Sequence, residues 1–332
     1  MQKSIILVGA NGFWSLKELV NATLFHDRFE LVYFKDFKIE QGKNHLVVAV
    51  VVADQPFGPD IMDKFPNLKT IARTGTGYDN IDVEVAHKRG IVVTRVAGLN
   101  AEAVSDFALA LMFSLSRSIV KMHNDMSCGK WEQLRQGMLL SEMTVGIVGL
   151  GHIGRLLSRK LNALNVRRIL GYNRTLRPEI KSMILETYLD FVSLEEVMSE
   201  SDMVIISIAL AEETKHLIDR HQLSLMKNTA CLINVSRGAV VDEDALAKCV
   251  AEKWIAGVAL DVFSSEPPAD DIFEKPFFQK LIESSKNGAN VILTSHNAGI
   301  TRNSVKNISL QVAKNTVNVL DKKFEAEGLE IV

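Results

Sequence analysis

Short runs of apolar and β-branched residues recur along the chain, each separated from the next by a segment long enough for a helix. Such runs are typical of strands in parallel sheets, which are buried on both faces. A first group comprises Ser4–Val8, Glu30–Phe34, Val47–Val52, Thr70–Arg73 and Ile91–Val93. A second group comprises Thr144–Val148, Arg168–Tyr172, Met203–Ile208, Ala230–Val235, Gly257–Asp261 and Asn290–Thr294. The pattern predicts an α/β protein with two parallel sheets.

Two longer segments have helical periodicity. Asn100–Arg117 lies between the two groups of strands and is apolar around most of its circumference, with Asn100 placed to cap its first turn. Two interpretations stay open: a core helix joining two domains, or a helix that packs partly against a second subunit. Asn303–Leu320 has apolar residues near one face and predicts a helix that closes the structure.

Length and charge narrow the class of protein. The chain has 332 residues, which at about 150 residues per domain indicates two domains. Apolar residues make up 47% and charged residues 23%, as in ordinary globular proteins. The net charge of −2 provides no basic excess for nucleic acid or for a membrane surface. A small-molecule partner is expected instead.

The cysteines and the apolar runs indicate a reducing compartment. Cys128, Cys231 and Cys249 are odd in number and lack CxxC spacing, so we expect buried thiols rather than disulfides or a metal site. The longest apolar run, Leu46–Ala53, is far shorter than the roughly 18 residues that span a bilayer. The amino terminus has only a brief apolar stretch, too short for a signal peptide. A cytoplasmic location is expected.

A glycine-rich loop predicts a dinucleotide site. The run Thr144–Val148 leads into GLGHIG, and a helical pattern follows. Free amides at a helix start, together with the helix dipole, favour a pyrophosphate. A tight turn without a ligand is the alternative. The candidate cofactor-binding residues of this loop are Gly149, Gly151, His152, Ile153 and Gly154.

The residues after the next strand bear on which cofactor binds. A carboxylate at this position normally accepts hydrogen bonds from the adenosine ribose, but the chain has Asn173, Arg174 and Thr175. The loss of the negative charge and the presence of a guanidinium suit a ribose 2′-phosphate. NADP is therefore favoured over NAD. Alternatively, Arg174 stacks on adenine or faces solvent.

A second glycine loop is a candidate anion site. Gly75, Thr76 and Gly77 follow the Thr70–Arg73 run, and successive backbone amides in such a turn bind anions. A turn without a ligand is an equally good interpretation.

Three polar residues follow three strands of the second group. Arg237, Glu266 and His296 come after the runs Ala230–Val235, Gly257–Asp261 and Asn290–Thr294. Loops at the carboxyl ends of parallel strands converge where ligands bind. Each residue alone has an ordinary structural explanation, so the prediction rests on their joint placement.

Together these side chains suit the reduction of a carbonyl group. A carboxylate beside His296 favours the imidazolium, which can protonate a developing alkoxide. The planar fork of Arg237 can hold a substrate carboxylate and polarise the neighbouring carbonyl. A 2-oxo acid would then accept hydride from a nicotinamide.

The order of five segments resembles the D-isomer-specific 2-hydroxyacid dehydrogenase family over nearly the whole chain. The segments are RTGTGYDNID (Arg73–Asp82), VGLGHIG (Val148–Gly154), NVSRGAVVDEDAL (Asn234–Leu246), GVALDVFSSEP (Gly257–Pro267) and TSHNAGIT (Thr294–Thr301). The resemblance implies that Arg237, Glu266 and His296 are catalytic. It also implies that Asp261 approaches the nicotinamide carboxamide and that the amides of Gly75–Gly77 receive the substrate carboxylate.

The resemblance further implies an architecture. A flavodoxin-like substrate domain, residues 1–98 and 299–332, encloses a Rossmann NAD(P)-binding domain, residues 99–298, with crossings near Gly98 and Gly299. Closure of the domains would complete the site, and a homodimer would form through the helical region after Asn100.

Some positions depart from the family pattern. Ser295 and Asn297 replace residues that usually flank the histidine, and we expect them to loosen its loop; Ala209 replaces a usual proline and leaves its turn less restricted. The segment RTGTGYDN is similar to the corresponding stretch of phosphoglycerate dehydrogenases, but the ADQPFG segment offers no Lys or Arg for a phosphate. The substrate therefore stays open among phosphoglycerate, hydroxypyruvate and glyoxylate types. A cofactor-sensing corepressor is the alternative function.

Overall fold

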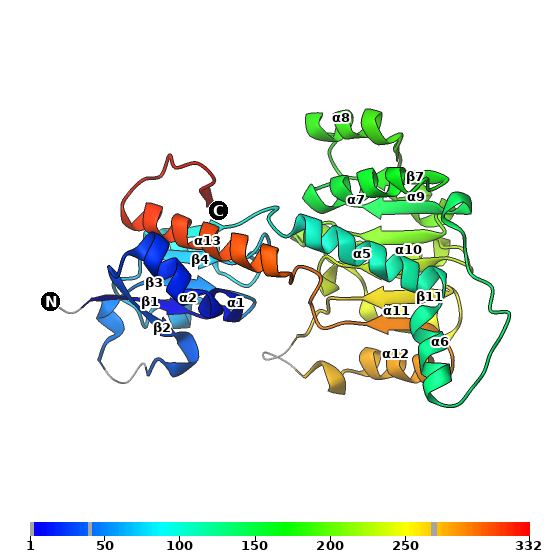
Figure 1. Cartoon of the computed structure of the whole chain (residues 1–332), viewed down its shortest axis with the longest axis horizontal. Helices are drawn as coiled ribbons and strands as arrows, with labels where there is room; N and C mark the ends of the chain where they lie inside the picture. The colour runs from blue at the N-terminus through cyan, green and yellow to red at the C-terminus, as the bar shows by residue number, and fades with distance from the viewer. Residues whose placement is uncertain (1–2, 39–41, 267–270) are drawn as a thin grey trace. The chain divides into compact units, whose positions relative to one another are not determined.

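The computed structural model describes residues 3–38, 42–266 and 271–332, which form two compact units. Unit 1 is drawn from residues 1–100 and 300–332, and unit 2 from residues 101–299. The crossings predicted near Gly98 and Gly299 lie beside these boundaries. Figure 1 shows the last helix of the chain in the same unit as the first strands. Pro267, the last residue of the predicted GVALDVFSSEP segment, lies outside the described residues.

Unit 1 contains a six-stranded sheet with the order β13-β5-β4-β3-β1-β2. Apart from β13, which pairs antiparallel with β5, neighbouring strands are parallel. The order of the first five strands is that of flavodoxin-like folds. The strands are β1 (Ser4–Val8), β2 (Phe29–Tyr33), β3 (Val47–Val52), β4 (Thr70–Arg73), β5 (Val92–Arg95) and β13 (Glu330–Ile331).

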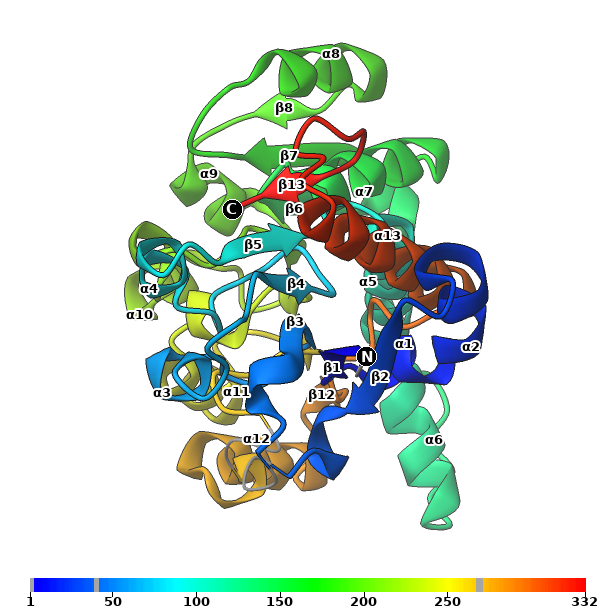
Figure 2. The same ribbon diagram turned by 90° about the vertical axis from the view of Figure 1, so that its left-hand side faces the viewer.

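Alternate residues of these strands enter two separate cores, one on each face of the sheet. Ile5 and Leu7 of β1 face one core, while Ile6 and Val8 face the other. Figure 2 shows α3 and α4 on one side of the sheet and α1, α2 and α13 on the other. The helices are α1 (Asn11–Ser15), α2 (Lys17–Val20), α3 (Pro59–Met62), α4 (Val83–Lys88) and α13 (Arg302–Leu320).

Unit 2 contains a seven-stranded sheet with the order β12-β11-β10-β9-β6-β7-β8. All the pairings are parallel. This order, which reverses beside β6, is that of a Rossmann fold. The strands are β6 (Thr144–Val148), β7 (Arg168–Tyr172), β8 (Asp190–Phe191), β9 (Met203–Ile206), β10 (Cys231–Asn234), β11 (Gly257–Leu260) and β12 (Asn290–Leu293).

Helices cover both faces of this sheet. Helices α5, α7 and α8 pack on one face, and helices α9 to α12 pack on the other. Figure 1 shows α5 running across the strands. The helices are α5 (Ala101–Ser116), α6 (Ile119–Ser127), α7 (His152–Ala163), α8 (Pro178–Thr187), α9 (Leu194–Glu200), α10 (Arg220–Leu225), α11 (Glu243–Ala251) and α12 (Pro276–Lys286).

The long helix α5 is a core helix of unit 2. Val104, Ala108, Leu111, Met112 and Leu115 are all buried in the core beneath it. The core interpretation of this segment therefore holds, although Phe113 and the following Ile119 are 37% and 48% exposed. In the described part of the chain, no single helix is long and apolar enough to span a membrane. The pair α5 and α6 reaches that length only across a 60° bend.

The prediction of three buried thiols is wrong for Cys128. This residue directly follows α6, a helix with no buried residue, so the chain already lies at the surface there and Cys128 is exposed. Cys231 and Cys249 are buried, and burial raises the pKa of the Cys231 thiol to about 12 and that of Cys249 to about 11. Both therefore stay protonated and unreactive at neutral pH.

Candidate active site

The glycine loop between β6 and α7 has the shape that a dinucleotide needs. Gly149 has φ of +100°, and a Cβ there would lie 2.6 Å from the backbone of Ile208. A Cβ on Gly154 would lie 2.0 Å from the carbonyl oxygen of Gly149. These two glycines are required by the protein's own packing. A Cβ on Gly151, by contrast, would meet nothing within 4 Å.

The open space beside Gly151 lies at the amino end of the twelve-residue helix α7. His152, whose side chain is exposed, and the half-buried Ile153 form its first turn. Amide groups at this end point out of the helix and carry its positive dipole. The loop therefore fits a pyrophosphate, with the second glycine leaving room for the ligand rather than for another part of the chain.

The residues at the end of β7 are tied to this loop. Asn173 accepts a hydrogen bond from the amide of Leu150 (3.1 Å) and donates one to the carbonyl of Thr175 (2.9 Å). The side-chain amide of Asn173 thus fixes this turn, at the position where a carboxylate would usually bind the adenosine ribose. Arg174 is 70% exposed, and its guanidinium lies 3.5 Å from the carboxylate of Glu213.

Glu213 was not anticipated from the sequence. It lies in the loop after β9, where Thr214 accepts a hydrogen bond from the amide of Ala211 and donates one to the carbonyl of Ala209, both 2.7 Å long. The hydroxyl of Thr214 therefore orders the turn that was expected to be less restricted without proline. The two adjacent glutamates of the loop, Glu212 and Glu213, were the available signal in the sequence.

Glu266 and His296 are brought together by the structure. The Nδ1 atom of His296 lies 2.8 Å from one carboxylate oxygen of Glu266, and the other oxygen accepts the amide of Phe263 at 2.8 Å. Both side chains are partly exposed, at 31% for His296 and 26% for Glu266. With Nδ1–H donated to the carboxylate, Nε2 is the ring nitrogen that could exchange a proton with a substrate.

Asp261 fixes the loop that carries His296. It is fully buried, and its carboxylate accepts hydrogen bonds from the hydroxyl of Thr294 (2.6 Å) and from the amides of Asn297 and Ala298 (both 2.9 Å). The amide of His296 donates to the carbonyl of Asp261 at 2.7 Å. Contact between Asp261 and a nicotinamide carboxamide stays a prediction.

The same loop holds His296 in a strained backbone conformation. Its φ is 51°, a left-handed value that residues other than glycine rarely adopt. Ser295 and Asn297 were expected to loosen this loop. Instead, the side-chain amide of Asn297 donates to the carbonyl and hydroxyl oxygens of Ser295, at 3.0 and 2.8 Å. These two departures from the family pattern thus bond to each other.

Arg237 lies in the loop after β10, next to the strand that leads to Glu266. Its guanidinium donates to the carbonyl of Ser236 at 3.0 Å, and its own carbonyl accepts from Asn234 at 2.9 Å. A Cβ on the next residue, Gly238, would lie 2.0 Å from the carbonyl carbon of Phe263. The Arg237 loop is thus pressed against the turn that leads to Glu266.

The other glycine loop lies in unit 1, after β4, and is held by a residue that sequence reasoning did not assign. Arg73 is 5% exposed and donates to the carbonyl of Gly77 at 2.9 Å. It also forms a 2.6 Å ion pair with Asp54. Thr76 and Gly75 are linked to Val96 of the following segment by hydrogen bonds of 3.5 and 3.2 Å. The loop therefore has a defined shape.

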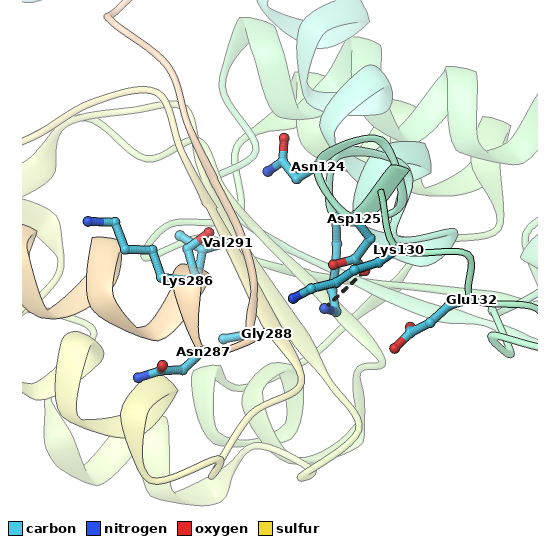
Figure 3. Close-up of a pocket in the computed structure, with 11 residues that line it drawn as sticks. Asn124, Asp125, Lys130, Glu132, Lys286, Asn287, Gly288 and Val291 are labelled. Atoms are coloured by element: carbon cyan, nitrogen blue, oxygen red, sulfur yellow. Dashed lines mark hydrogen bonds and ion pairs between the residues drawn. The ribbon is translucent and has the colours of Figure 1, made fainter. Parts of the chain in front are cut away.

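A cavity of about 280 Å³ lies elsewhere in unit 2. Figure 3 shows Asn124, Asp125, Lys130 and Glu132 on one side of it and Lys286 to Gly288 on the other. Its lining includes Val291, near the start of β12, whereas His296 follows the end of that strand. The cavity is therefore not part of the candidate site. Within the described residues, no group of three or more His, Cys, Asp or Glu side chains could hold a metal ion.

Comparison with known proteins places this geometry in context. A family model for "D-isomer specific 2-hydroxyacid dehydrogenase, NAD binding domain" matches residues 109–298. The glyoxylate reductase of Thermococcus litoralis is 37% identical over 304 residues, which cover 87% of each chain. The glyoxylate reductase of Pyrococcus horikoshii is 34% identical over 312 residues, covering 90% of this chain and 89% of that one.

Solved structures match both units. The D-lactate dehydrogenase of Aquifex aeolicus, in complex with NAD and lactic acid, superposes with a TM-score of 0.86 at 24% identity over 99% of both chains. A glyoxylate reductase from Paecilomyes thermophila gives a TM-score of 0.77 at 25% identity, over 100% of this chain and 98% of that one.

Proposed function

The chain belongs to the D-isomer-specific 2-hydroxyacid dehydrogenase family and transfers a hydride between a nicotinamide cofactor and a small 2-oxo or 2-hydroxy acid, and from this premise we propose that its substrate is of the glyoxylate or hydroxypyruvate type. The glyoxylate reductases that match most of the chain support this choice. A phosphorylated substrate is disfavoured, because the segment after β3 supplies Asp54 rather than a cation, and that aspartate is paired with Arg73.

We propose that His296 is the general acid and base and that Glu266 orients it. The observation that carries this proposal is the 2.8 Å contact between Nδ1 and the Glu266 carboxylate. A bound nicotinamide supplies the hydride that the carbonyl carbon accepts. Nε2 of the imidazolium donates a proton to the oxygen that gains negative charge, and Glu266 stabilises the cation until then. In the oxidative direction neutral His296 removes the hydroxyl proton.

Arg237 and the Gly75–Gly77 loop bind the substrate in this proposal. The planar guanidinium offers a carboxylate two parallel hydrogen bonds. The backbone amides of Gly75, Thr76 and Gly77 supply further donors in a loop whose shape Arg73 fixes. Residues 1–98 and 299–332 would accordingly be the substrate domain, and residues 99–298 the cofactor domain.

NADP is the proposed preferred cofactor. The amides at the start of α7 would hold the pyrophosphate, and the β7 end would hold the adenosine ribose. Asn173 introduces no negative charge, and Arg174 is exposed beside it. The Glu213 carboxylate weakens this preference without abolishing it, because an exposed ion pair of this length contributes only about 0–1 kcal/mol.

A homodimer is proposed on the basis of the segment that follows α5. Several large apolar side chains there are exposed: Ile119, Met126, Trp131, Leu134 and Leu139. Exposed apolar residues gathered in one region mark an interaction surface. Analytical ultracentrifugation is expected to give a dimer mass, and Trp131→Glu is expected to shift it toward monomer; a wild-type monomer at assay concentration would contradict the proposal. The cytoplasmic location stays a prediction.

The substrate proposal is tested by a panel of 2-oxo acids assayed with NADH and with NADPH. Glyoxylate and hydroxypyruvate are expected to give the highest kcat/KM, with pyruvate and phosphohydroxypyruvate lower. A maximum with the phosphorylated acid would overturn the substrate assignment but not the chemistry. If no 2-oxo acid is turned over while the dinucleotide still binds, a cofactor-sensing role replaces the enzymatic one.

A further inference from the structure

A buried carboxylate that the proposed mechanism does not use lies at the start of α11. Glu243 is the first residue of this helix and is only 8% exposed. The helix is already capped by Asp242, whose side chain accepts the amide of Ala245 at 3.0 Å. Burying a carboxylate is unfavourable unless hydrogen bonds compensate. The contacts of Glu243 therefore have to come from outside its own helix.

Within the part of the chain that the structure describes, both carboxylate oxygens of Glu243 bond to Ser264. One oxygen of Glu243 accepts the Ser264 amide at 2.8 Å, and the other accepts the Ser264 hydroxyl. The preceding amide, that of Phe263, is accepted by Glu266 at 2.8 Å. Two carboxylates thus bind successive amides of one turn: Glu266 from within the turn, and Glu243 from the neighbouring helix.

This turn is the common support of the three candidate catalytic residues. Glu266, which ends it, orients His296. On its other side, a Cβ on Gly238 would lie 2.1 Å from the Ser264 nitrogen, so the Arg237 loop rests against the same atoms. A 3₁₀ turn covers Gly238–Val240, and two extended residues, Val241 and Asp242, lead from it to Glu243. A shift of the turn at residues 263–264 would therefore move the Arg237 loop as well as Glu266.

We infer that Glu243 is a positioning residue that holds the 263–264 turn and, through it, keeps the Glu266 carboxylate against His296. The inference rests on the proposed roles of Glu266 and His296. Burial, the largest influence, raises the pKa of Glu243, and the nearby charges of Asp244 and Glu266 act in the same direction, while the Ser264 bonds oppose them. The bonds to Ser264 are thus what favours the carboxylate at this buried position.

Two substitutions separate geometry from charge. Glu243→Gln loses the charge but keeps the length, so its amide oxygen can still accept the Ser264 amide. Glu243→Asp keeps the charge but is one methylene too short to reach. We expect Glu243→Asp and Glu243→Ala to lower kcat roughly 10- to 100-fold, as expected for catalytic groups displaced by about 1 Å. Glu243→Gln is expected to stay within about threefold of the wild type.

Asp244→Asn is the matched control. It removes a carboxylate one position further along the same helix, from an exposed side chain, and is expected to leave kcat unchanged. Circular dichroism and urea unfolding of each variant check that it is folded. If Glu243→Ala does not fold, the comparison of Glu243→Asp with Glu243→Gln decides the question, and a Glu243→Gln defect as large as that of Glu243→Asp would overturn the inference.

Two further readouts distinguish positioning from general stability. In Glu243→Ala, the pH at which the reduction rate falls to half is expected to move lower, because the imidazolium has lost its held carboxylate. The double variant Glu243→Ala/Glu266→Ala is expected to lose much less activity than the product of the two single losses, since Glu243 acts mainly through Glu266. Additive losses, or an unchanged pH profile, would overturn the inference. Full activity of His296→Ala would instead overturn the proposed function itself.

Discussion

The carboxyl edge of the sheet in unit 2 is built differently at its two ends. At the end of β7, Arg174 is 70% exposed and forms one ion pair with Glu213, which is 65% exposed. At the ends of β11 and β12, Asp261 is fully buried, and its carboxylate accepts three hydrogen bonds from the loop that carries His296. One end recognises the cofactor's ribose in our proposal, and the other transfers a proton.

The difference indicates which property of the enzyme is easily changed. An exposed ion pair contributes about 0–1 kcal/mol and is screened by salt. Removing a member of a buried network costs about 1–3 kcal/mol for each partner left unsatisfied. Cofactor preference therefore depends on a few exposed contacts, whereas the proton-transfer pair depends on a buried framework that tolerates little.

The largest expected effect comes from His296→Ala. Loss of the general acid should lower kcat for 2-oxo acid reduction by about 10² to 10⁴, with little change in dinucleotide binding. His221→Ala, which removes an exposed histidine from α10, is the control and should retain full activity. Steady-state kinetics measure both, and unchanged turnover of His296→Ala would remove this residue from the mechanism.

Arg237→Lys is expected to have the next largest effect. Lysine keeps the positive charge but loses the fork that binds a carboxylate through two bonds. We expect kcat/KM for the 2-oxo acid to fall roughly 10- to 100-fold, the equivalent of one charged hydrogen bond. Fluorescence titration should show unchanged affinity for the reduced cofactor, and wild-type kcat/KM would show that charge alone suffices.

At the exposed end the expected changes are smaller. Arg174→Ser should lower kcat/KM for NADPH by up to about fivefold and leave that for NADH unchanged, because only the 2′-phosphate loses a partner. Glu213→Gln should raise NADPH use a few-fold, and both effects should shrink as salt is added. A strong preference of the wild-type enzyme for NADH would show that Arg174 does not read the phosphate.

The smallest expected effect is on stability and involves Glu243. Its pKa is raised above the usual value of 4.5 in the folded protein, so the native state binds its proton more tightly than the unfolded chain does. The contribution of the Glu243 side chain to stability is therefore complete at pH values below its ordinary pKa, and it is lost as pH rises through the raised pKa.

Urea unfolding of the wild type and Glu243→Gln from about pH 4 to about pH 8 measures this contribution. The free energy of unfolding of the wild type, relative to that of Glu243→Gln, should decline as pH rises. A difference that stays constant or grows with pH would show that the Glu243 carboxylate is not disfavoured by burial.

The strands of both sheets followed closely from the sequence, because parallel strands are covered on both faces and are rich in apolar residues. The bounds of β1, β3, β4, β6 and β7 are those predicted, and the other predicted strands differ by one or two residues at their ends. The two-residue strands β8 and β13 were not predicted. Such short edge strands have no periodicity of their own and form only because a neighbouring strand offers hydrogen-bonding groups.

The residues of the candidate site were found from strand ends, but their supports were not. The sequence gives no sign that Arg73, Glu213 and Glu243 differ from ordinary charged residues. Apart from Gly77, the partners named for them lie in other loops. The exposure of Cys128 was missed for a related reason, because burial depends on what covers a helix end. Patterns along the chain indicate which secondary structure and burial a residue prefers, but they do not identify a partner that is distant in sequence.

In the proposed mechanism the Glu266 carboxylate stabilises the imidazolium of His296 during reduction. The decisive experiment is the pH dependence of kcat/KM in Glu266→Gln, compared with that of the wild type. Because an opposite charge favours the cation, we expect the midpoint of the alkaline fall in rate to move about one pH unit or more lower in the variant. A midpoint equal to that of the wild type, with activity intact, would show that Glu266 does not stabilise the imidazolium.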